Sequence, residues 1–320
     1  MPENLMFSLN STMPLFFIMI LGYILYQKQF LTEGFVSVAN KFVFNVTLPV
    51  MLFNDLAGTD IRSSFDADYV GFCAAVTMVS IVVIWTLSRW LFKDKSLVGE
   101  FVQACYRSSA AILGAAFIQN IYGTSGMSGL MILGSVPLYN IFAVLILTLE
   151  CPDPKGLTEP LWKKICHSIV KILCNPTLIA IALGMLASLI KLPFPTMVTK
   201  AMSSLGSMTS PLALLAIGAG FKGKAALAKI KPTALATVIK LLVLPALFLP
   251  LAVRLGFTDQ KLVALLVMLG SITTPSAYVM AKQMGHDGTL TGSVCAATTV
   301  LSAVTLTFWL FWARSGGYIL

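Results

Sequence analysis

The sequence predicts an all-α integral membrane protein with ten transmembrane helices, arranged as two inverted repeats of five helices each. Hydrophobic residues make up 57% of the 320 residues and charged residues only 11%, whereas a soluble domain carries about 25% charged residues. Apolar runs of about 20 residues, the length needed to cross a bilayer, recur along the chain. Prolines and glycines also recur at one offset between the two halves, which indicates an internal duplication.

The apolar runs determine the expected helices. The connections between them are short, so no soluble domain is inserted. The longest connection, residues 151–167, is rich in proline and charge, which predicts a cytoplasmic linker between a first repeat at 1–150 and a second repeat at 168–320. The N-terminal residues include no Lys or Arg, so we do not expect a signal peptide. The ten expected segments are residues 8–26, 39–57, 69–92, 98–120, 127–149, 168–190, 197–220, 233–253, 260–283 and 289–312.

The repeat is visible as residues that recur 162 positions apart. Because each repeat holds an odd number of spans, the two copies must be inverted relative to each other in the membrane. Inverted repeats are typical of secondary transporters, whose substrate site lies at the repeat interface near the middle of the bilayer. A duplication without transport remains the alternative. The recurring pairs are Pro14 and Pro176, Gly22 and Gly184, Pro49 and Pro211, Gly58 and Gly220, and Gly123 and Gly285.

Loop charges predict the orientation. If the N-terminus lies outside, the inner segments hold 13 Lys and Arg residues and the outer segments hold 6. Because basic loops stay on the cytoplasmic side, we expect both termini outside the plasma membrane. The net charge of +9 is spread over these loops, so it does not indicate a nucleic-acid partner.

The most informative stretch is GSITTPSAYVMAKQMG, Gly270 to Gly285. Pro275 lacks a backbone donor and clashes with the preceding turn, so the helix should be interrupted there. The hydroxyls of Ser271, Thr273, Thr274 and Ser276 surround the expected break. A broken, hydroxyl-lined helix at mid-membrane depth is typical of a transporter site. The alternative is a kinked helix whose hydroxyls bond to their own carbonyls.

The fourth span is the repeat mate of this stretch. It carries Ser108, Ser109 and Gly114 but no proline; Gly and Ser can also kink a helix, so we expect a break there too. Two opposed broken helices would aim their N-termini at one centre, and such positively polarised ends favour an anion.

The charged residues within the spans are positive. Asp55, Glu100, Glu150 and Asp259 all lie near span ends, which disfavours a cation–proton exchanger with an intramembrane carboxylate relay. Arg107 and Lys240 lie within spans and would attract an anion or hold a broken helix end; Lys240 could instead extend to the membrane surface. The polar residues of the spans more often join helices than contact substrate; they are Asn45, Thr47, Asn54 and Asn140.

Enzyme and metal signatures are absent from the sequence. It contains no HExxH, GxSxG or P-loop motif, and its six cysteines show no metal-ligand spacing. We expect neither catalysis nor a cofactor. Two functions from different classes remain open, a transporter of small anions and a membrane sensor that binds a ligand without moving it.

Six segments carry a family resemblance. They read LPVMLFNDLAG (48–58), IQNIYG (118–123), SVPLYN (135–140), KILCNPTLIAIALG (171–184), KLLVLP (240–245) and TTPSAYVMAKQMGHD (273–287). In order and spacing they resemble helices 2, 4, 5, 6, 8 and 9 of the auxin efflux carrier family of plants and its bacterial relatives, which include malate and malonate permeases.

The resemblance implies a fold shared with bile-acid symporters and sodium–proton antiporters. In that fold helices 4 and 9 cross at broken midpoints, helices 1, 2, 6 and 7 form a scaffold, and the other six form a moving transport domain. The scaffold helices also offer a surface for a homodimer. Substrate anions bind beside the crossing, which here implies Ser108 to Gly114, Asn140 and Thr273 to Ser276, with Asn45, Thr47 and Pro49 on the scaffold side.

This chain departs from the family pattern in helix 4. The family usually has GLP or GIP where this chain has Gly114, Ala115 and Ala116, and the plant carriers have an asparagine where Ser109 stands. We therefore expect a small carboxylate such as malate or malonate, rather than an indole acid, carried by an elevator or rocking motion. A proton or sodium ion could be the coupling ion.

Overall fold

The computed structural model describes residues 2–58, 66–110, 118, 121–122, 126–151, 176–191, 193–221 and 227–319. All named elements in these ranges are helices. Of the predicted linker at 151–167, only Cys151 is described, and Gly114 also lies outside the described residues. The elements are α1 (Pro2–Gln27), α2 (Glu33–Phe42), η1 (Val43–Thr47), α3 (Leu48–Ala57), α4 (Ala67–Leu91), η2 (Lys95–Leu97), α5 (Val98–Tyr106), α7 (Gly126–Leu149), α9 (Pro176–Leu189), α10 (Thr196–Ser207), α11 (Thr209–Ala219), α13 (Ile230–Val238), η3 (Ile239–Val243), α14 (Leu244–Arg254), α15 (Asp259–Gly270), α16 (Pro275–Gln283) and α17 (Thr289–Ser315).

The helices are long and apolar enough for a multi-pass membrane protein. In the part of the chain that the structure describes, six continuous helical stretches have the length and hydropathy to cross a bilayer, and Phe16–Gln27 and Pro176–Leu189 are shorter apolar helices. The segment predicted at 39–57 begins at Glu33 in the structure rather than at residue 39. The reason is a cap, because the Thr32 hydroxyl accepts a hydrogen bond from the backbone N–H of Phe35.

Two of these stretches contain a π-helical turn just before a Leu-Pro pair. The turns η1 and η3 lead directly into Pro49 and Pro245, each the second residue of the next helix. A proline cannot donate to the carbonyl four residues earlier, and the widened turn accommodates its ring. The carbonyl of Leu241, left without its helical donor by Pro245, accepts a hydrogen bond from Trp309 Nε1 at 3.0 Å.

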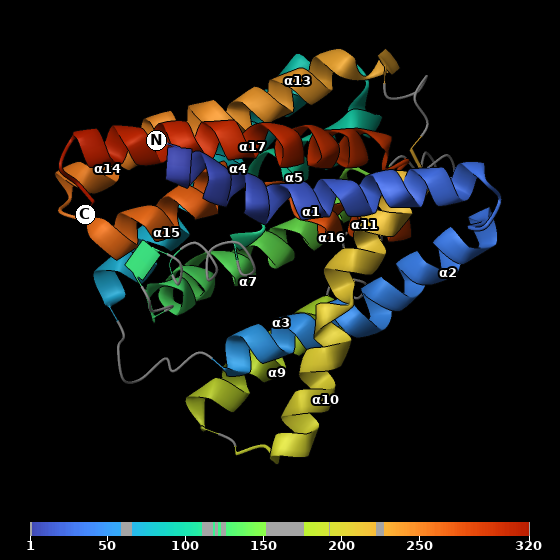
Figure 1. The fold of residues 1–320 in the computed structure, drawn as a ribbon, viewed down its shortest axis with the longest axis horizontal. Coiled ribbons are helices and arrows are strands. Elements are labelled where there is room, and N and C mark those ends of the chain that lie inside the picture. The colour runs from blue at the N-terminus through green and yellow to red at the C-terminus, as the bar shows by residue number, and fades with distance from the viewer. Residues whose placement is uncertain are drawn as a thin grey trace, which may run out of the picture.

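The helices pack in two groups that are visible in Figure 1. Helices α3, α9 and α10 lie together at one end of the molecule, while α13, α14 and α17 run along the opposite side. Helix α1 lies against α11 and α17. The contact of α1 with α11 is close because of glycine: a Cβ at Gly218 would lie 1.9 Å from the Met19 carbonyl oxygen, and one at Gly22 would lie 2.4 Å from that of Leu215.

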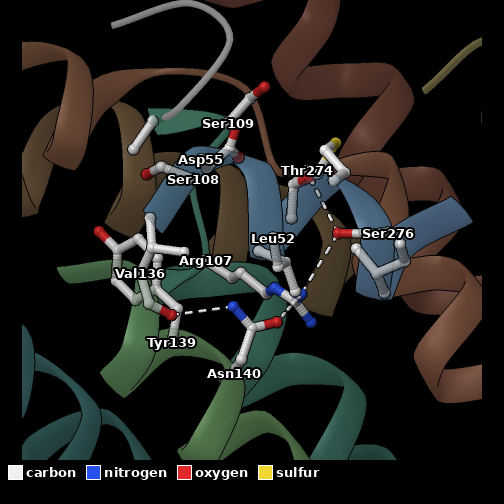
Figure 2. A pocket seen from close by; sticks show the side chains of 13 residues that line it. Leu52, Asp55, Arg107, Ser108, Ser109, Val136, Tyr139, Asn140, Thr274 and Ser276 are labelled. Atoms are coloured by element: carbon white, nitrogen blue, oxygen red, sulfur yellow. Dashed lines mark hydrogen bonds between the residues drawn. The ribbon is translucent and has the colours of Figure 1, made fainter. Parts of the chain in front are cut away.

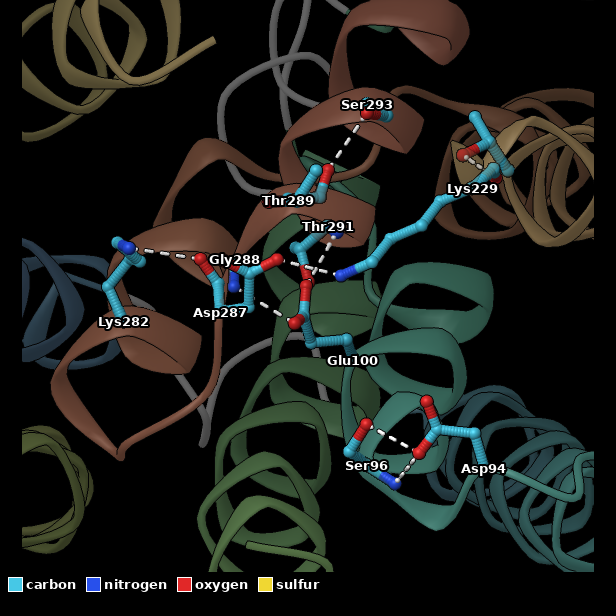
Figure 3. Close-up of polar contacts among 11 residues, drawn as sticks. Asp94, Ser96, Glu100, Lys229, Lys282, Asp287, Gly288, Thr289, Thr291 and Ser293 are labelled. Atoms are coloured by element: carbon cyan, nitrogen blue, oxygen red, sulfur yellow. Dashed lines mark hydrogen bonds and ion pairs between the residues drawn. The ribbon is translucent and has the colours of Figure 1, made fainter. Parts of the chain in front are cut away.

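The start of α17 is fixed by a buried carboxylate from α5 (Figure 3). Glu100, which is 1% exposed, accepts bonds from the backbone N–H groups of Gly288 and Thr291, both at 2.9 Å, and from the Thr291 hydroxyl at 3.0 Å. The sequence placed Glu100 only near a span end; the structure shows that it caps a helix across 188 or more positions of sequence. Beside it, Lys229 and Asp287 form an ion pair at 2.7 Å.

Candidate functional site

The ninth apolar segment is interrupted where the sequence predicts it. Helix α15 ends at Gly270, Ser271 and Thr274 are extended, and α16 begins at Pro275. Proline disfavours helix for the residue before it and suits the first position of a new helix, which explains where α16 begins. The alternative of one kinked helix is therefore wrong.

The fourth segment is interrupted as well, although no proline is present. Helix α5 ends at Tyr106, and Arg107 is extended with φ −79° and ψ 112°. The two breaks cross each other. Ser108 and Thr273 form an antiparallel bridge, with hydrogen bonds from Ser109 N to the Ile272 oxygen at 3.0 Å and from Thr274 N to the Arg107 oxygen at 3.4 Å. Backbone groups freed by each break are thus satisfied by the other, as a non-aqueous environment requires.

Side chains form hydrogen bonds with further backbone groups at the crossing. The Thr273 hydroxyl donates to the Ala104 oxygen of α5 at 2.8 Å, and the Thr273 N–H donates to the Thr298 hydroxyl at 3.0 Å. The Met268 oxygen of α15 accepts from the Ser108 hydroxyl and, at 3.1 Å, from the Tyr139 hydroxyl. The last turns of α5 and α15 are therefore capped by Thr273, Ser108 and Tyr139, which lie outside those helices.

Lys240 supports this crossing from within the protein. Its side chain is fully buried, and Nζ donates to the Ser108 hydroxyl at 2.8 Å. It does not extend to a surface, so the alternative drawn from the sequence is wrong. A cation near the end of α15 also complements the negative end of that helix.

Arg107 lies beside the crossing and points toward α7 and α16 (Figure 2). It is 2% exposed. One of its terminal nitrogens donates to Asn140 Oδ1 at 2.6 Å and to the Ser276 hydroxyl at 3.3 Å, and the other contacts the sulfur of Met280. Among the described residues, no carboxylate lies within salt-bridge distance of this guanidinium.

Asn140 is held in the orientation that Arg107 needs. Its amide nitrogen donates to the Val136 oxygen one turn earlier in α7 at 2.8 Å, which leaves the amide oxygen to face the guanidinium (Figure 2). An amide whose nitrogen is engaged in this way presents an acceptor, not a donor, to Arg107.

A cavity of about 370 Å³, including the part open to solvent, lies at this point. One part of the lining consists of Arg107, Asn140 and the hydroxyls of Ser109, Thr274 and Ser276. One face of α3 forms the opposite wall, because positions three and four apart share a side of a helix. The lining residues are Leu48, Met51, Leu52, Asp55, Arg107, Ser108, Ser109, Ala110, Val136, Tyr139, Asn140, Thr274 and Ser276.

Comparison with known proteins identifies the family of this chain. Residues 7–310 match the family model described as "Membrane transport protein". The chain belongs to this membrane transport protein family. Its members are transporters, not enzymes. The family is the one that the auxin efflux carrier resemblance indicated.

Relatives in this family align over nearly their full length. One is the "Uncharacterized transporter YfdV" of Escherichia coli strain K12, 24% identical over 97% of this chain and 99% of the relative. Another is an "Uncharacterized transporter" of Methanothermobacter thermautotrophicus, 22% identical over 94% of this chain and 97% of the relative. Both relatives are named as transporters.

The structure brings together most of the residues singled out for this transporter. Six of them line the cavity: Arg107, Ser108, Ser109, Asn140, Thr274 and Ser276. Others lie away from its lining. Thr273 and Lys240 form hydrogen bonds at the crossing and Pro275 begins α16, while Asn45, Thr47 and Pro49 lie in η1 and the first turn of α3.

Asp55 and Tyr139 line the cavity, yet the sequence did not single them out as site residues. Asp55 was set aside because it lies near the end of its span. The signal that would have found it is the helical spacing of Leu48, Met51, Leu52 and Asp55, which places them on one face. Of the two helix N-termini expected at the centre, that of α16 is described; after Ser109 the description stops at Ala110, and residues 111–117 are not described.

Proposed function

We propose that this protein is a secondary transporter of small organic anions and that its carboxylate substrate binds in the cavity at the crossing. The observation that carries the proposal is the buried Arg107 guanidinium, whose described partners are an amide oxygen, a hydroxyl and a sulfur. A buried cation costs several kcal/mol unless a charge or strong acceptors compensate it. A carboxylate ligand supplies that compensation, and its planar geometry matches the fork of the guanidinium.

The remainder of the cavity suits the same ligand. The N-terminus of α16 has the positive end of a helix, which favours an anion. The hydroxyls of Ser109, Thr274 and Ser276 can donate to further oxygens. The volume of about 370 Å³ includes space open to solvent, so the enclosed part is smaller, which favours a small acid over an indole acid.

Packing supports a movement of one helix group against another. The repeat offset relates α1 to α9 and α3 to α11, and the packing follows this relation, because α1 packs on α11 and α9 packs on α3. The related residues Gly22 and Gly184 lie at these two contacts. The hydrogen bonds of Arg107, Ser108, Thr273 and Lys240 instead join α5, α7, η3, α15, α16 and α17. This division is the one that an elevator with scaffold helices 1, 2, 6 and 7 requires.

Counterflow in liposomes tests the proposal. The purified chain is reconstituted in vesicles preloaded with unlabelled acid, and uptake of labelled succinate, malate, aspartate and indole-3-acetate is measured. We expect counterflow of at least one four-carbon acid. Arg107→Gln should lower it by at least about 30-fold, since removing one member of a buried charge pair costs about 2–5 kcal/mol. Arg107→Lys should retain part of the activity, and Arg254→Gln, on an exposed end of α14, should retain all of it.

Two results would refute this function. Counterflow in Arg107→Gln at the wild-type rate would show that the substrate does not bind at the crossing. Binding of these acids by thermal shift without any counterflow would indicate a membrane sensor instead. Proton or sodium gradients imposed on the same vesicles identify the coupling ion. The orientation with both termini outside the plasma membrane and the homodimer through scaffold helices stay predictions.

A further inference from the structure

Lys240 is a buried charged side chain that the proposed anion site does not use. It is fully buried and belongs to the π-helical turn η3, which packs against α5 and α15. Its Nζ donates a hydrogen bond to the Ser108 hydroxyl at 2.8 Å, and this hydroxyl donates in turn to the Met268 oxygen. Among the described residues, no carboxylate lies within ion-pair distance of Nζ. The described groups that stabilise this cation are therefore dipoles.

Two helices end at this point with their negative poles. Helix α5 ends at Tyr106 and α15 ends at Gly270, and the residues that follow them pair with each other at the crossing. The last carbonyls of a helix have no helical donor, and together they carry about half a negative charge. Broken helices whose C-terminal ends meet in a membrane hold coupling cations in transporters. The crossing therefore has the electrostatics of a cation site, and Nζ of Lys240 lies one hydroxyl group away from the last turn of α15.

This cation site adjoins the proposed anion site without being part of it. Ser108 lines the cavity that contains Arg107, whereas Lys240 does not. In a carrier that is coupled to sodium, the metal ion binds and leaves in each cycle. An ammonium group on a lysine side chain is tethered to the protein and cannot leave.

We propose that Lys240 fills the cation site of the crossing with its own ammonium group, so that this carrier transports its anion without a sodium ion bound there. The inference rests on the proposed function. Oxygen acceptors can bind an ammonium or a small metal cation. In Lys240→Ala the ammonium is removed, and the Ser108 hydroxyl and the end of α15 border the space that the side chain filled. A small cation can enter this space from the cavity, so the variant should need a cation that the wild type does not need.

Replacement of sodium in the wild-type protein is the first test. Counterflow of the best-transported four-carbon acid is measured in sodium medium and in medium where bulky N-methylglucamine replaces all sodium. We expect the two rates to agree within about 2-fold, because the ammonium stays at the helix ends. A wild type whose counterflow requires sodium would overturn the inference while anion transport stands. A wild type without counterflow of any acid would instead refute the proposed function.

Rescue of a shortened side chain is the second test. In N-methylglucamine medium, Lys240→Ala should lose at least about 10-fold of the counterflow, because the buried acceptors lose a charged partner. Sodium, lithium or methylammonium should restore most of it. Lys240→Met fills the same space without a charge, so these cations should not change its rate. Lys231→Ala is the matched control, because Lys231 is exposed on α13, and it should behave like the wild type.

Thermal unfolding in detergent gives a readout that does not depend on transport. A ligand that binds only the folded protein raises its Tm. Sodium, lithium or methylammonium should therefore raise the Tm of Lys240→Ala by several degrees and leave the wild type and Lys240→Met unchanged.

Two results with Lys240→Ala would overturn the inference. One is full counterflow in N-methylglucamine medium, and the other is a Tm that none of the three cations raises. A variant that folds only in the presence of these cations would support the inference. A variant that folds in none of the media would count against it, because the cations then fail to replace the ammonium.

Discussion

The buried cap on α17 allows one stability prediction to be developed from the structure. Glu100 accepts three hydrogen bonds from Gly288 and Thr291 at the start of the 27-residue helix α17. Replacing it by Gln changes one acceptor oxygen into an NH₂ group with almost no change in shape. Whichever way the amide is turned, this NH₂ group faces at least one backbone N–H donor.

The size of the effect follows from these contacts. At least one hydrogen bond to a charged group is lost, worth about 1.5–3 kcal/mol. The favourable interaction of the carboxylate with the positive end of α17 contributes about 0.3–1 kcal/mol more. Glu100→Gln should therefore destabilise the protein by about 2–4 kcal/mol. At about 2 °C per kcal/mol for a chain of this size, the Tm falls by about 4–8 °C.

Thermal unfolding of the purified protein in detergent, followed by intrinsic fluorescence, measures this change. Glu33→Gln is the matched control, because Glu33 is exposed and accepts one long bond of 3.4 Å from the Tyr26 hydroxyl. Its Tm should change by about 1 °C or less. A Glu100→Gln variant as stable as the wild type would show that the carboxylate does not hold α17.

Three further predictions follow from other contacts in the structure. Pro275→Ala should slow counterflow strongly with a smaller effect on the Tm, because the bonds of Thr273 hold the crossing while α16 loses its rigid first residue; wild-type rates would contradict this. Lys240→Met should leave the affinity for a transported acid within about 2-fold, since Nζ bonds Ser108 and the residue does not line the cavity; a 10-fold weaker affinity would place it in the site. The hydrogen bond from Lys261 holds the pKa of Asp66 below its usual value, so the pair stabilises the protein above pH 4 and less as the pH falls through this lowered pKa. Both side chains are about one-third exposed, so the pair contributes no more than about 1 kcal/mol to stability. Asp66→Asn should therefore lower the Tm only slightly at pH 7, and the difference from the wild type should vanish near pH 2.

The sequence predicted the helical segments that the structure describes because their signal is local. Apolar length and proline position act within one or two turns, so the membrane class, the helical segments and the interruption before Pro275 could all be inferred from residue order. Boundaries were less accurate, as at Glu33, since a cap by Thr32 adds a polar first turn that an apolar run does not include.

The candidate site was predicted in part for the same reason. Ser109, Asn140, Thr274 and Ser276 stand out as polar residues in apolar spans, and the structure places them in the lining. Thr273 looks the same in sequence, yet its hydroxyl caps α5. A hydroxyl that binds ligand and one that holds a helix end cannot be told apart without knowing which carbonyl lies 2.8 Å away.

What the sequence determined by itself is that this chain is a multi-pass helical membrane protein of a transporter family, with one helix broken at Pro275. Only the tertiary structure decided where helix 4 breaks, because the extended backbone of Arg107 and Ser108 is stabilised by pairing with Ile272 to Thr274, about 165 positions away, and not by a local breaker. The same distance explains Asp55. Its place near a span end is local information, whereas its position opposite Arg107 depends on how α3 packs against the crossing.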